Sequence, residues 1–176
     1  SVGAIRKNLG VRTVFNLIGP LVNPLHPTAQ VLGVYNQSLT HTVAEALRLL
    51  DRQQAVVLHS REGLDEAGLG DLTDISFLSN GQVTEEVINP QDLGLTPAPL
   101  ASLKGGNVQE NAEILKAVLQ GKGDRAQADC VALNSGLALR IAGVAKSWNE
   151  GLEIASQIIQ SGAAWDKAEA LVRFLK

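Results

Sequence analysis

Residues 30–59 read QVLGVYNQSLTHTVAEALRLLDRQQAVVLH, and the order of apolar and polar residues predicts a strand, a helix and a second strand. The runs at 30–35 and 54–59 are short, apolar and rich in β-branched residues, which is typical of strands buried on both faces. Ser38 is a suitable N-cap for the helix between them. The helix would carry one apolar stripe at helical spacing, formed by Leu39, Val43, Ala46, Leu47 and Leu50. We therefore expect a right-handed βαβ unit.

The next part of the chain predicts a β-hairpin and a winding connection. Residues 73–79 and 82–88 alternate around Asn80-Gly81, a pair that tolerates the positive φ angles of a tight hairpin turn. Prolines and glycines then interrupt regular structure up to about residue 106.

From Asn107 onward the sequence predicts helices. Asn107 with Glu110, and Ser147 with Glu150, have the spacing of capping boxes. The first of these helices would carry one stripe, formed by Val108, Ala112, Leu115 and Leu119, and a last helix would run from about Asp166 to Leu175. The order of elements predicts an α/β fold, with a central mixed, mostly parallel sheet flanked by helices.

Composition limits the classes of function. The chain has 176 residues, of which 45% are hydrophobic, enough to bury the core of one domain. Its 15 basic residues lie among 18 acidic ones and only 3% of residues are aromatic, which argues against nucleic-acid binding. No apolar run approaches the roughly 20 residues that span a bilayer, so we expect no membrane insertion.

The single cysteine, Cys130, and the absence of a charged and apolar leader favour a cytoplasmic location. The chain opens at Ser1, contains no methionine and passes almost at once into a structured-looking segment. We therefore expect that its natural beginning is missing.

An acidic turn, residues 61–68, follows the strand that ends near His59. Ligands of open α/β sheets bind beyond the carboxyl ends of strands, and Mg²⁺ typically takes one or two protein carboxylates together with phosphate oxygens and water. Asp65 and Glu66 suit such an ion. Solvated acids on a surface loop are the alternative, and spacing alone favours that alternative because such pairs are common on surfaces.

Other polar candidates carry less chemistry. We expect structural roles for His26, His41 and Cys130, because they lack the spacing of metal ligands or an activating partner. His59 stays open between structure and function, because it lies beside the acidic turn. Asn134-Ser135-Gly136 interrupts a helix with small polar residues; it either admits another element or a ligand, or reflects packing alone.

Several segments together are similar to anthranilate phosphoribosyltransferases. The most specific is RKNLGVRTVFNLIGPLVNP at residues 6–24. It is followed, in order, by QVLGVY (30–35), GLDE (63–66), LGLTP (93–97), GGNVQEN (105–111) and LQGKG (119–123). The resemblance covers nearly the whole chain and implies the C-terminal α/β portion of this family, whose architecture is shared with nucleoside phosphorylases.

The resemblance implies transfer of a phosphoribosyl group from phosphoribosyl pyrophosphate to the amine of anthranilate, with release of pyrophosphate, in tryptophan biosynthesis. Asp65 and Glu66 match the family's Mg²⁺-binding pair. Arg6 matches the arginine that contacts anthranilate, a role that suits a guanidinium because it pairs with a carboxylate. Gly19 and Pro20 match a turn that lines the aromatic site. A homodimer is implied for the full-length protein.

The chain departs from the family pattern because the N-terminal helical region and the glycine-rich pyrophosphate loop have no counterpart. Residues 1–24 would correspond to the remnant of the helical domain and the hinge, and residues 25–176 to the α/β domain. We expect the remnant to pack differently or to lie exposed. The chain alone is expected to have little or no transferase activity.

Two other interpretations of the sequence stay open. A pyrimidine nucleoside phosphorylase shares the architecture and also acts at an anomeric ribose carbon, although its motifs differ from those found here. A non-catalytic α/β module is the alternative from a different class.

Overall fold

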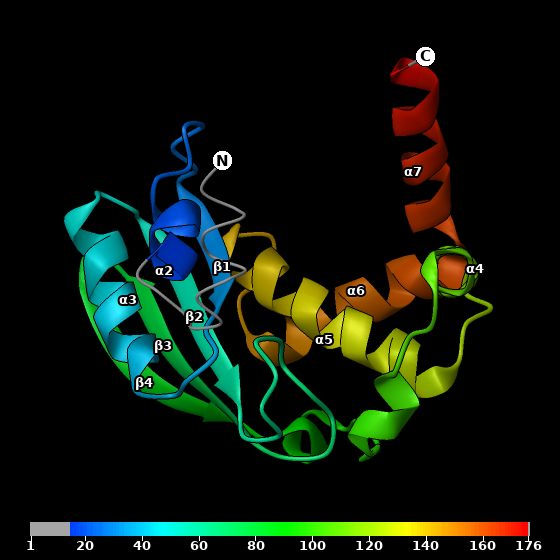
Figure 1. Cartoon of the computed structure of the whole chain (residues 1–176), viewed down its shortest axis with the longest axis horizontal. Coiled ribbons are helices and arrows are strands. Elements are labelled where there is room, and N and C mark those ends of the chain that lie inside the picture. Colours follow the sequence, from blue (N-terminus) through cyan, green and yellow to red (C-terminus); the bar gives the residue numbers. More distant parts are fainter. Residues whose placement is uncertain (1–14, 176) are drawn as a thin grey trace, which may run out of the picture.

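The parallel unit predicted from residues 30–59 is present. The structure, a computed structural model, describes residues 15–175. Strands β1 (Ala29–Gly33) and β2 (Gln54–Ser60) pair in parallel, and helix α3 (Leu39–Leu49) connects them (Figure 1). Ser38 precedes α3 as expected, but its side chain does not cap the helix; its hydroxyl donates instead to Asn36 Oδ1 at 2.9 Å.

The predicted hairpin is confirmed as β3 (Thr73–Ser79) and β4 (Gln82–Ile88). Asn80 and Gly81 connect the strands with φ angles of 51° and 74°, the left-handed pair that a tight turn of this kind requires. The order in the sheet is β1-β2-β3-β4.

The sheet is mixed and flanked by helices, as predicted, but it is not mostly parallel. The β1–β2 pairing is parallel, whereas β2–β3 and β3–β4 are antiparallel. The reason lies in the connections. A helix crossover returns the chain in the same direction, while the loop of residues 61–72 and the two-residue turn reverse it.

Two apolar clusters cover the two faces of the sheet, because successive side chains of a strand point to opposite sides. Val56 and Leu58 of β2 lie in the cluster that packs under α5 (Arg125–Ile141) and α6 (Trp148–Ser161). Ala55 and Val57 lie in the cluster beneath α3. The central strand β2 is therefore buried on both faces, as its sequence predicts, and Figure 1 shows α3 on one side of the sheet and α5 with α6 on the other.

The remaining elements surround this core. They are α2 (Phe15–Leu21), the short 3₁₀ helices η1 (Pro90–Leu93) and η2 (Leu100–Leu103), α4 (Val108–Leu119) and α7 (Ala163–Phe174). The capping box of Asn107 and Glu110 is confirmed at the start of α4. Gly162, with φ of 77°, ends α6, so that α7 begins at Ala163, earlier than predicted. Along residues 15–175, no helix is long and apolar enough to cross a membrane.

The apolar stripe expected on α4 is wrong as a buried face. Val108 and Leu115 have exposed fractions of 88% and 56%, and the buried residue of this helix is Val118. Helix α4 lies at the edge of the domain beside α7 (Figure 1), so periodicity identifies the helix but not the face that it buries.

Helices α5 and α6 cross at very short range because two glycines meet there. A Cβ atom on Gly136 would lie 2.7 Å from the backbone nitrogen of Leu152, and one on Gly151 would overlap the carbonyl oxygen of Gly136. Gly136 therefore admits another element, the first of the alternatives for the Asn134-Ser135-Gly136 segment.

We predict that Gly136→Ala destabilises the protein. The new methyl group meets backbone rather than a movable side chain, and overpacking costs about 1–3 kcal/mol, more than the helix propensity that alanine gains, up to about 1 kcal/mol. Urea denaturation should show a lower free energy of unfolding, with Ser135→Ala in the next position as control. A Gly136→Ala protein as stable as the parent would contradict the close crossing.

Candidate functional site

The acidic segment begins with a tight turn at the end of β2. Gly63 has a φ angle of 88°, and its N–H donates to the carbonyl of Ser60 at 2.8 Å. The N–H of Ser60 donates to the carbonyl of Leu64 at 3.0 Å. Gly63 is the residue that permits this left-handed conformation at low cost, and the turn directs the chain toward Asp65 and Glu66.

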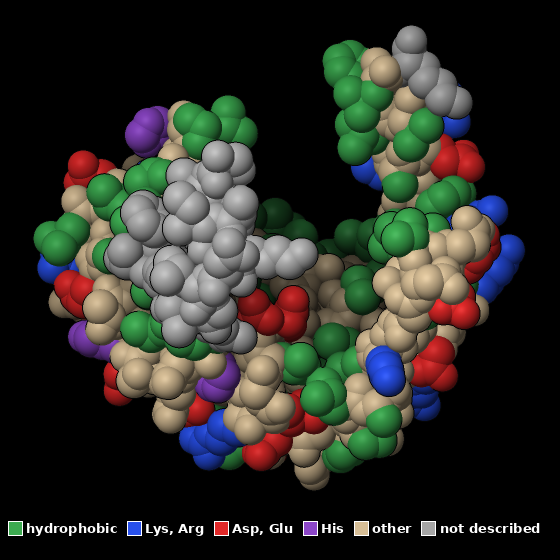
Figure 2. Space-filling model, in the orientation of Figure 1, with side chains coloured by type: hydrophobic (Ala, Val, Ile, Leu, Met, Phe, Trp, Pro, Cys, Tyr) green, Lys and Arg blue, Asp and Glu red, His purple; other side chains and the backbone are tan. Residues whose placement is uncertain are grey.

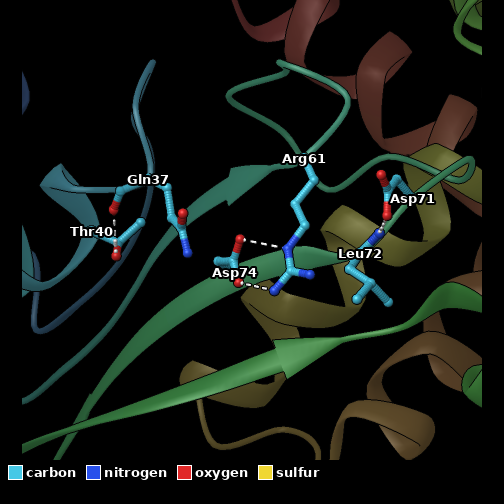
Figure 3. A network of polar contacts seen from close by, with 6 residues as sticks. All are labelled: Gln37, Thr40, Arg61, Asp71, Leu72 and Asp74. Carbon is cyan, nitrogen blue, oxygen red and sulfur yellow. Dashed lines mark hydrogen bonds and ion pairs between the residues drawn. The ribbon is translucent and has the colours of Figure 1, made fainter.

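Two other charged residues of the segment hold the loop rather than a ligand. Nε and NH2 of Arg61 donate to the two carboxylate oxygens of Asp74 at 2.9 and 2.8 Å, and Figure 3 shows this paired arrangement. Oε2 of Glu62 accepts the N–H of Gly70 at 3.0 Å. Arg61 thus ties the loop to Asp74 of β3 and Glu62 binds a backbone N–H of the loop, which leaves Asp65 and Glu66 as the candidate ligands.

Asp65 and Glu66 lie close enough to affect one another. Both residues are exposed, yet the pKa of the Glu66 carboxyl is raised, first by its partial burial and then by the charge of Asp65 and a hydrogen bond with it. Two adjacent carboxylates that repel in this way favour a bound cation, which removes the repulsion.

The end of β1 meets this turn without a side chain between them. A Cβ atom on Gly33 would overlap the carbonyl oxygen of Asp65, so Gly33 allows the turn to lie directly against the strand. The same edge of the sheet forms a pocket of about 270 Å³. Its walls are Leu17, Pro20, Leu32, Gly33, Val34, Tyr35 and Asp65.

This pocket brings together two residues that the sequence analysis assigned to different subsites. Pro20 was predicted to line the aromatic site and Asp65 to hold the metal. Gly19 and Pro20, predicted to form a turn, lie in the last turn of helix α2. Arg6 lies outside the described residues.

A second, larger pocket includes the other member of the acidic pair, Glu66, in its lining. It measures about 670 Å³ and is lined by Leu64, Glu66, Leu100, Ala101, Leu103, Lys104 and Cys130. The sequence analysis missed the part that η2 and Lys104 contribute. The sequence signal for this contact was weak, because the proline-rich connection predicts a loop but not that the loop packs beside Glu66. Figure 2 shows a hollow between the lobe that carries α2 and the arm of α7, with acidic side chains visible at its floor.

His59 and His41 each contact another part of the protein, which is typical of a structural role. Nδ1 of His59 lies 2.7 Å from the carbonyl of Val34; because that oxygen can only accept, Nδ1 carries the proton. His59 thus joins β2 to the end of β1. His41 pairs with Glu85 at 3.5 Å on the surface.

Within residues 15–175 no group of three or more His, Cys, Asp and Glu side chains is arranged to hold a metal ion. Asp65 and Glu66 therefore do not form a closed protein cage. Two carboxylates fit Mg²⁺ nonetheless, because this ion usually keeps several waters and takes the rest of its ligands from substrate phosphates.

Comparison with known proteins identifies the family of this chain. Residues 1–165 match the model of a glycosyl transferase family, a/b domain. The chain is 57% identical over 177 residues to anthranilate phosphoribosyltransferase 2 of Nostoc sp. strain PCC 7120, which covers 99% of this chain and 49% of the relative. The chain thus spans about half the length of the curated relatives that it matches.

Solved structures agree in fold. The anthranilate phosphoribosyltransferase of Thermus thermophilus superposes with a TM-score of 0.91 at 39% identity, over 99% of this chain and 51% of that one. The Saccharomyces cerevisiae enzyme in complex with PRPP and Mg gives a TM-score of 0.85 at 31% identity, over 96% of this chain and 48% of that one.

We predict that Cys130 reacts slowly with alkylating agents in the folded protein. Burial, followed by the charges of Glu66 and Glu62, raises the pKa of the thiol from 9.0 to about 11. Because the thiolate is the nucleophile, two pKa units reduce its population near pH 8 about 100-fold.

Iodoacetamide labelling followed by mass spectrometry measures this, with protein unfolded in guanidinium as control. Because the pKa of the thiol is higher in the folded protein, its protonated form contributes to the free energy of unfolding. This contribution is complete below pH 9.0 and is lost as the pH rises through about 11. Equal labelling rates in the folded and unfolded protein would contradict the assignment.

Proposed function

The chain belongs to the glycosyl transferase family whose a/b domain it matches over residues 1–165, and from this premise we propose that it acts as the α/β part of an anthranilate phosphoribosyltransferase. The reaction breaks the bond between the anomeric carbon and pyrophosphate and forms a bond to the amine of anthranilate, which loses a proton. The named relatives favour this reaction over that of a pyrimidine nucleoside phosphorylase.

One observation supports the proposal most strongly. Pro20, the candidate for the aromatic site, and Asp65, the candidate for the metal, line the same pocket of about 270 Å³ at the carboxyl end of β1. A transferase must hold donor and acceptor next to each other, because much of its rate enhancement comes from proximity and orientation. A pocket whose lining includes both apolar residues, Leu17 and Pro20, and the carboxylate of Asp65 suits that task.

Asp65 and Glu66 would hold Mg²⁺ together with the donor. Their fit rests on the adjacent carboxylates and on the raised pKa of Glu66, which Asp65 helps to cause. When bound, the ion would neutralise charge that develops on the departing pyrophosphate. The carboxylates themselves would orient the donor, and the missing side chain at Gly33 lets Asp65 lie directly against β1.

The acceptor side of the proposal rests on residues 6–24. Pro20 and Leu17 of α2 would contact the aromatic ring of anthranilate, and Arg6 would pair with its carboxylate. Leu17 and Leu21 pack against the apolar cluster beneath α3, so α2 is attached to the sheet. Residues 1–24 would then act as the hinge to a helical domain, and residues 25–176 as the α/β domain.

The rest of the site would come from segments that the full-length relatives carry in their other half. Two features support a partner for this chain. Strand β1 is at the edge of the sheet, with β2 as its pairing partner among the described residues. Helix α7 buries none of its described side chains, and Phe174 has an exposed fraction of 85%. The missing N-terminal helical domain is the partner that we propose, with a homodimer for the full-length protein and a cytoplasmic location.

We predict that Asp65→Asn and Glu66→Gln, each made in the full-length protein, raise the apparent KM for Mg²⁺ about tenfold or more, since even residues that only support a metal ligand alter affinity by about 10–100-fold. Initial rates of pyrophosphate release over a Mg²⁺ titration measure this. The 176-residue chain in the same assay should form almost no product.

The control is Glu85→Gln, an exposed acid on β4 that pairs with His41. It should keep the magnesium dependence of the parent. Unchanged magnesium dependence in both the Asp65 and the Glu66 variants would refute the metal site.

A further inference from the structure

We propose that Asn134 is a positioning residue for the carboxylate pair, which it controls through the backbone of Ala67. The inference rests on the proposed function, because it concerns the same site. Asn134 lies in the middle of α5, whereas Asp65 and Glu66 lie in the loop after β2. The side chain of Asn134 therefore connects the helical layer with the candidate metal site.

The contact is a paired one. Oδ1 of Asn134 accepts the N–H of Ala67 at 2.9 Å, and Nδ2 donates to the carbonyl of the same residue at 2.9 Å. The side-chain amide thus satisfies both polar groups of one buried backbone unit, since Ala67 has an exposed fraction of 0%. Without Asn134 the N–H of Ala67 would lose its partner, and its carbonyl would keep only the long contact from Sγ of Cys130 at 3.5 Å.

The surroundings fix the orientation of this amide. Nδ2 also donates to the carbonyl of Cys130 at 2.9 Å, one helical turn earlier. If the amide were rotated by half a turn, its oxygen would face two carbonyl oxygens and its nitrogen would face an N–H group. Only one orientation of the amide satisfies all three partners, so the side chain of Asn134 holds the backbone of Ala67 in one position.

The hydrogen bonds from Asn134 act together with the close packing of Asp65 against Gly33. The missing side chain at Gly33 lets the backbone of Asp65 lie directly against β1. Glu66 directly precedes Ala67, and of the described segment 65–69 it is Ala67 whose backbone is hydrogen-bonded to another element. The segment that carries the two carboxylates thus lies against Gly33 at Asp65 and is hydrogen-bonded to Asn134 at Ala67. Releasing Ala67 would let Glu66 move away from Asp65.

A merely structural asparagine would affect stability alone, whereas a positioning residue must alter binding of the metal and donor. We would make Asn134→Ala and Asn134→Asp in the full-length protein. The aspartate keeps the shape and one acceptor but sets an oxygen against the carbonyls of Ala67 and Cys130. Leu137→Ala is the matched control, because Leu137 is buried in the same helix and lies in the core.

Three measurements would be made: calorimetric titration with PRPP in the presence of Mg²⁺, hydrogen exchange of the peptide that covers residues 62–70, and steady-state kinetics. Both Asn134 variants should bind about tenfold more weakly, with kcat at saturating Mg²⁺ and PRPP changed less than KM. Exchange should accelerate in this peptide. Leu137→Ala should lower the melting temperature and leave the affinity unchanged.

The outcomes separate this inference from the function on which it rests. If Asp65→Asn weakens binding and the Asn134 variants do not, the positioning role fails and the proposed function stands. If none of them weakens binding, both fail. Equal weakening by Leu137→Ala, or failure of both Asn134 variants to fold when Leu137→Ala folds, would reduce Asn134 to a structural role.

Discussion

The parallel pairing of β1 with β2 is the constraint on which the rest of the site depends. It brings the carboxyl ends of two strands to one edge of the sheet, where ligands of α/β folds bind. One strand end leads to Gly33, whose missing side chain lets the acidic turn approach. The other leads into that turn and to Asp65. With antiparallel pairing, the carboxyl ends of β1 and β2 would lie at opposite ends of the strands.

Local signals in the sequence predicted much of the fold because their physics is local. The Asn80-Gly81 turn, the Asn107 and Glu110 capping box and the buried strand β2 depend on residues that are neighbours in the chain. The position of the acidic turn after β2 was predictable for the same reason. Strand β1 was expected to be buried on both faces as well, but it lies at the edge of the sheet and is only partly buried. The roles of Asp65 and Glu66 came from the family resemblance, since spacing alone did not distinguish a metal site from a solvated loop.

The features that escaped prediction depend on contacts between distant segments. The sheet was expected to be mostly parallel, but β3 runs antiparallel to β2 because a loop, rather than a helix, connects them. The apolar stripe of α4 is largely exposed, because periodicity does not reveal which face of a helix meets a neighbour. Asn134 could be noted as a polar residue in a helix, but its partner Ala67 lies 67 positions earlier. Lys104 likewise reaches the pocket of Glu66 through an irregular connection.

The central claim is that Asp65 and Glu66 together hold the cation that accompanies the phosphoribosyl donor. Anomalous diffraction from crystals of the full-length protein grown with Mn²⁺ and PRPP tests it most directly. The account predicts an anomalous peak within coordination distance of both carboxylates, with donor phosphate oxygens completing the shell. A manganese ion bound to PRPP, with both carboxylates directed elsewhere, would contradict it.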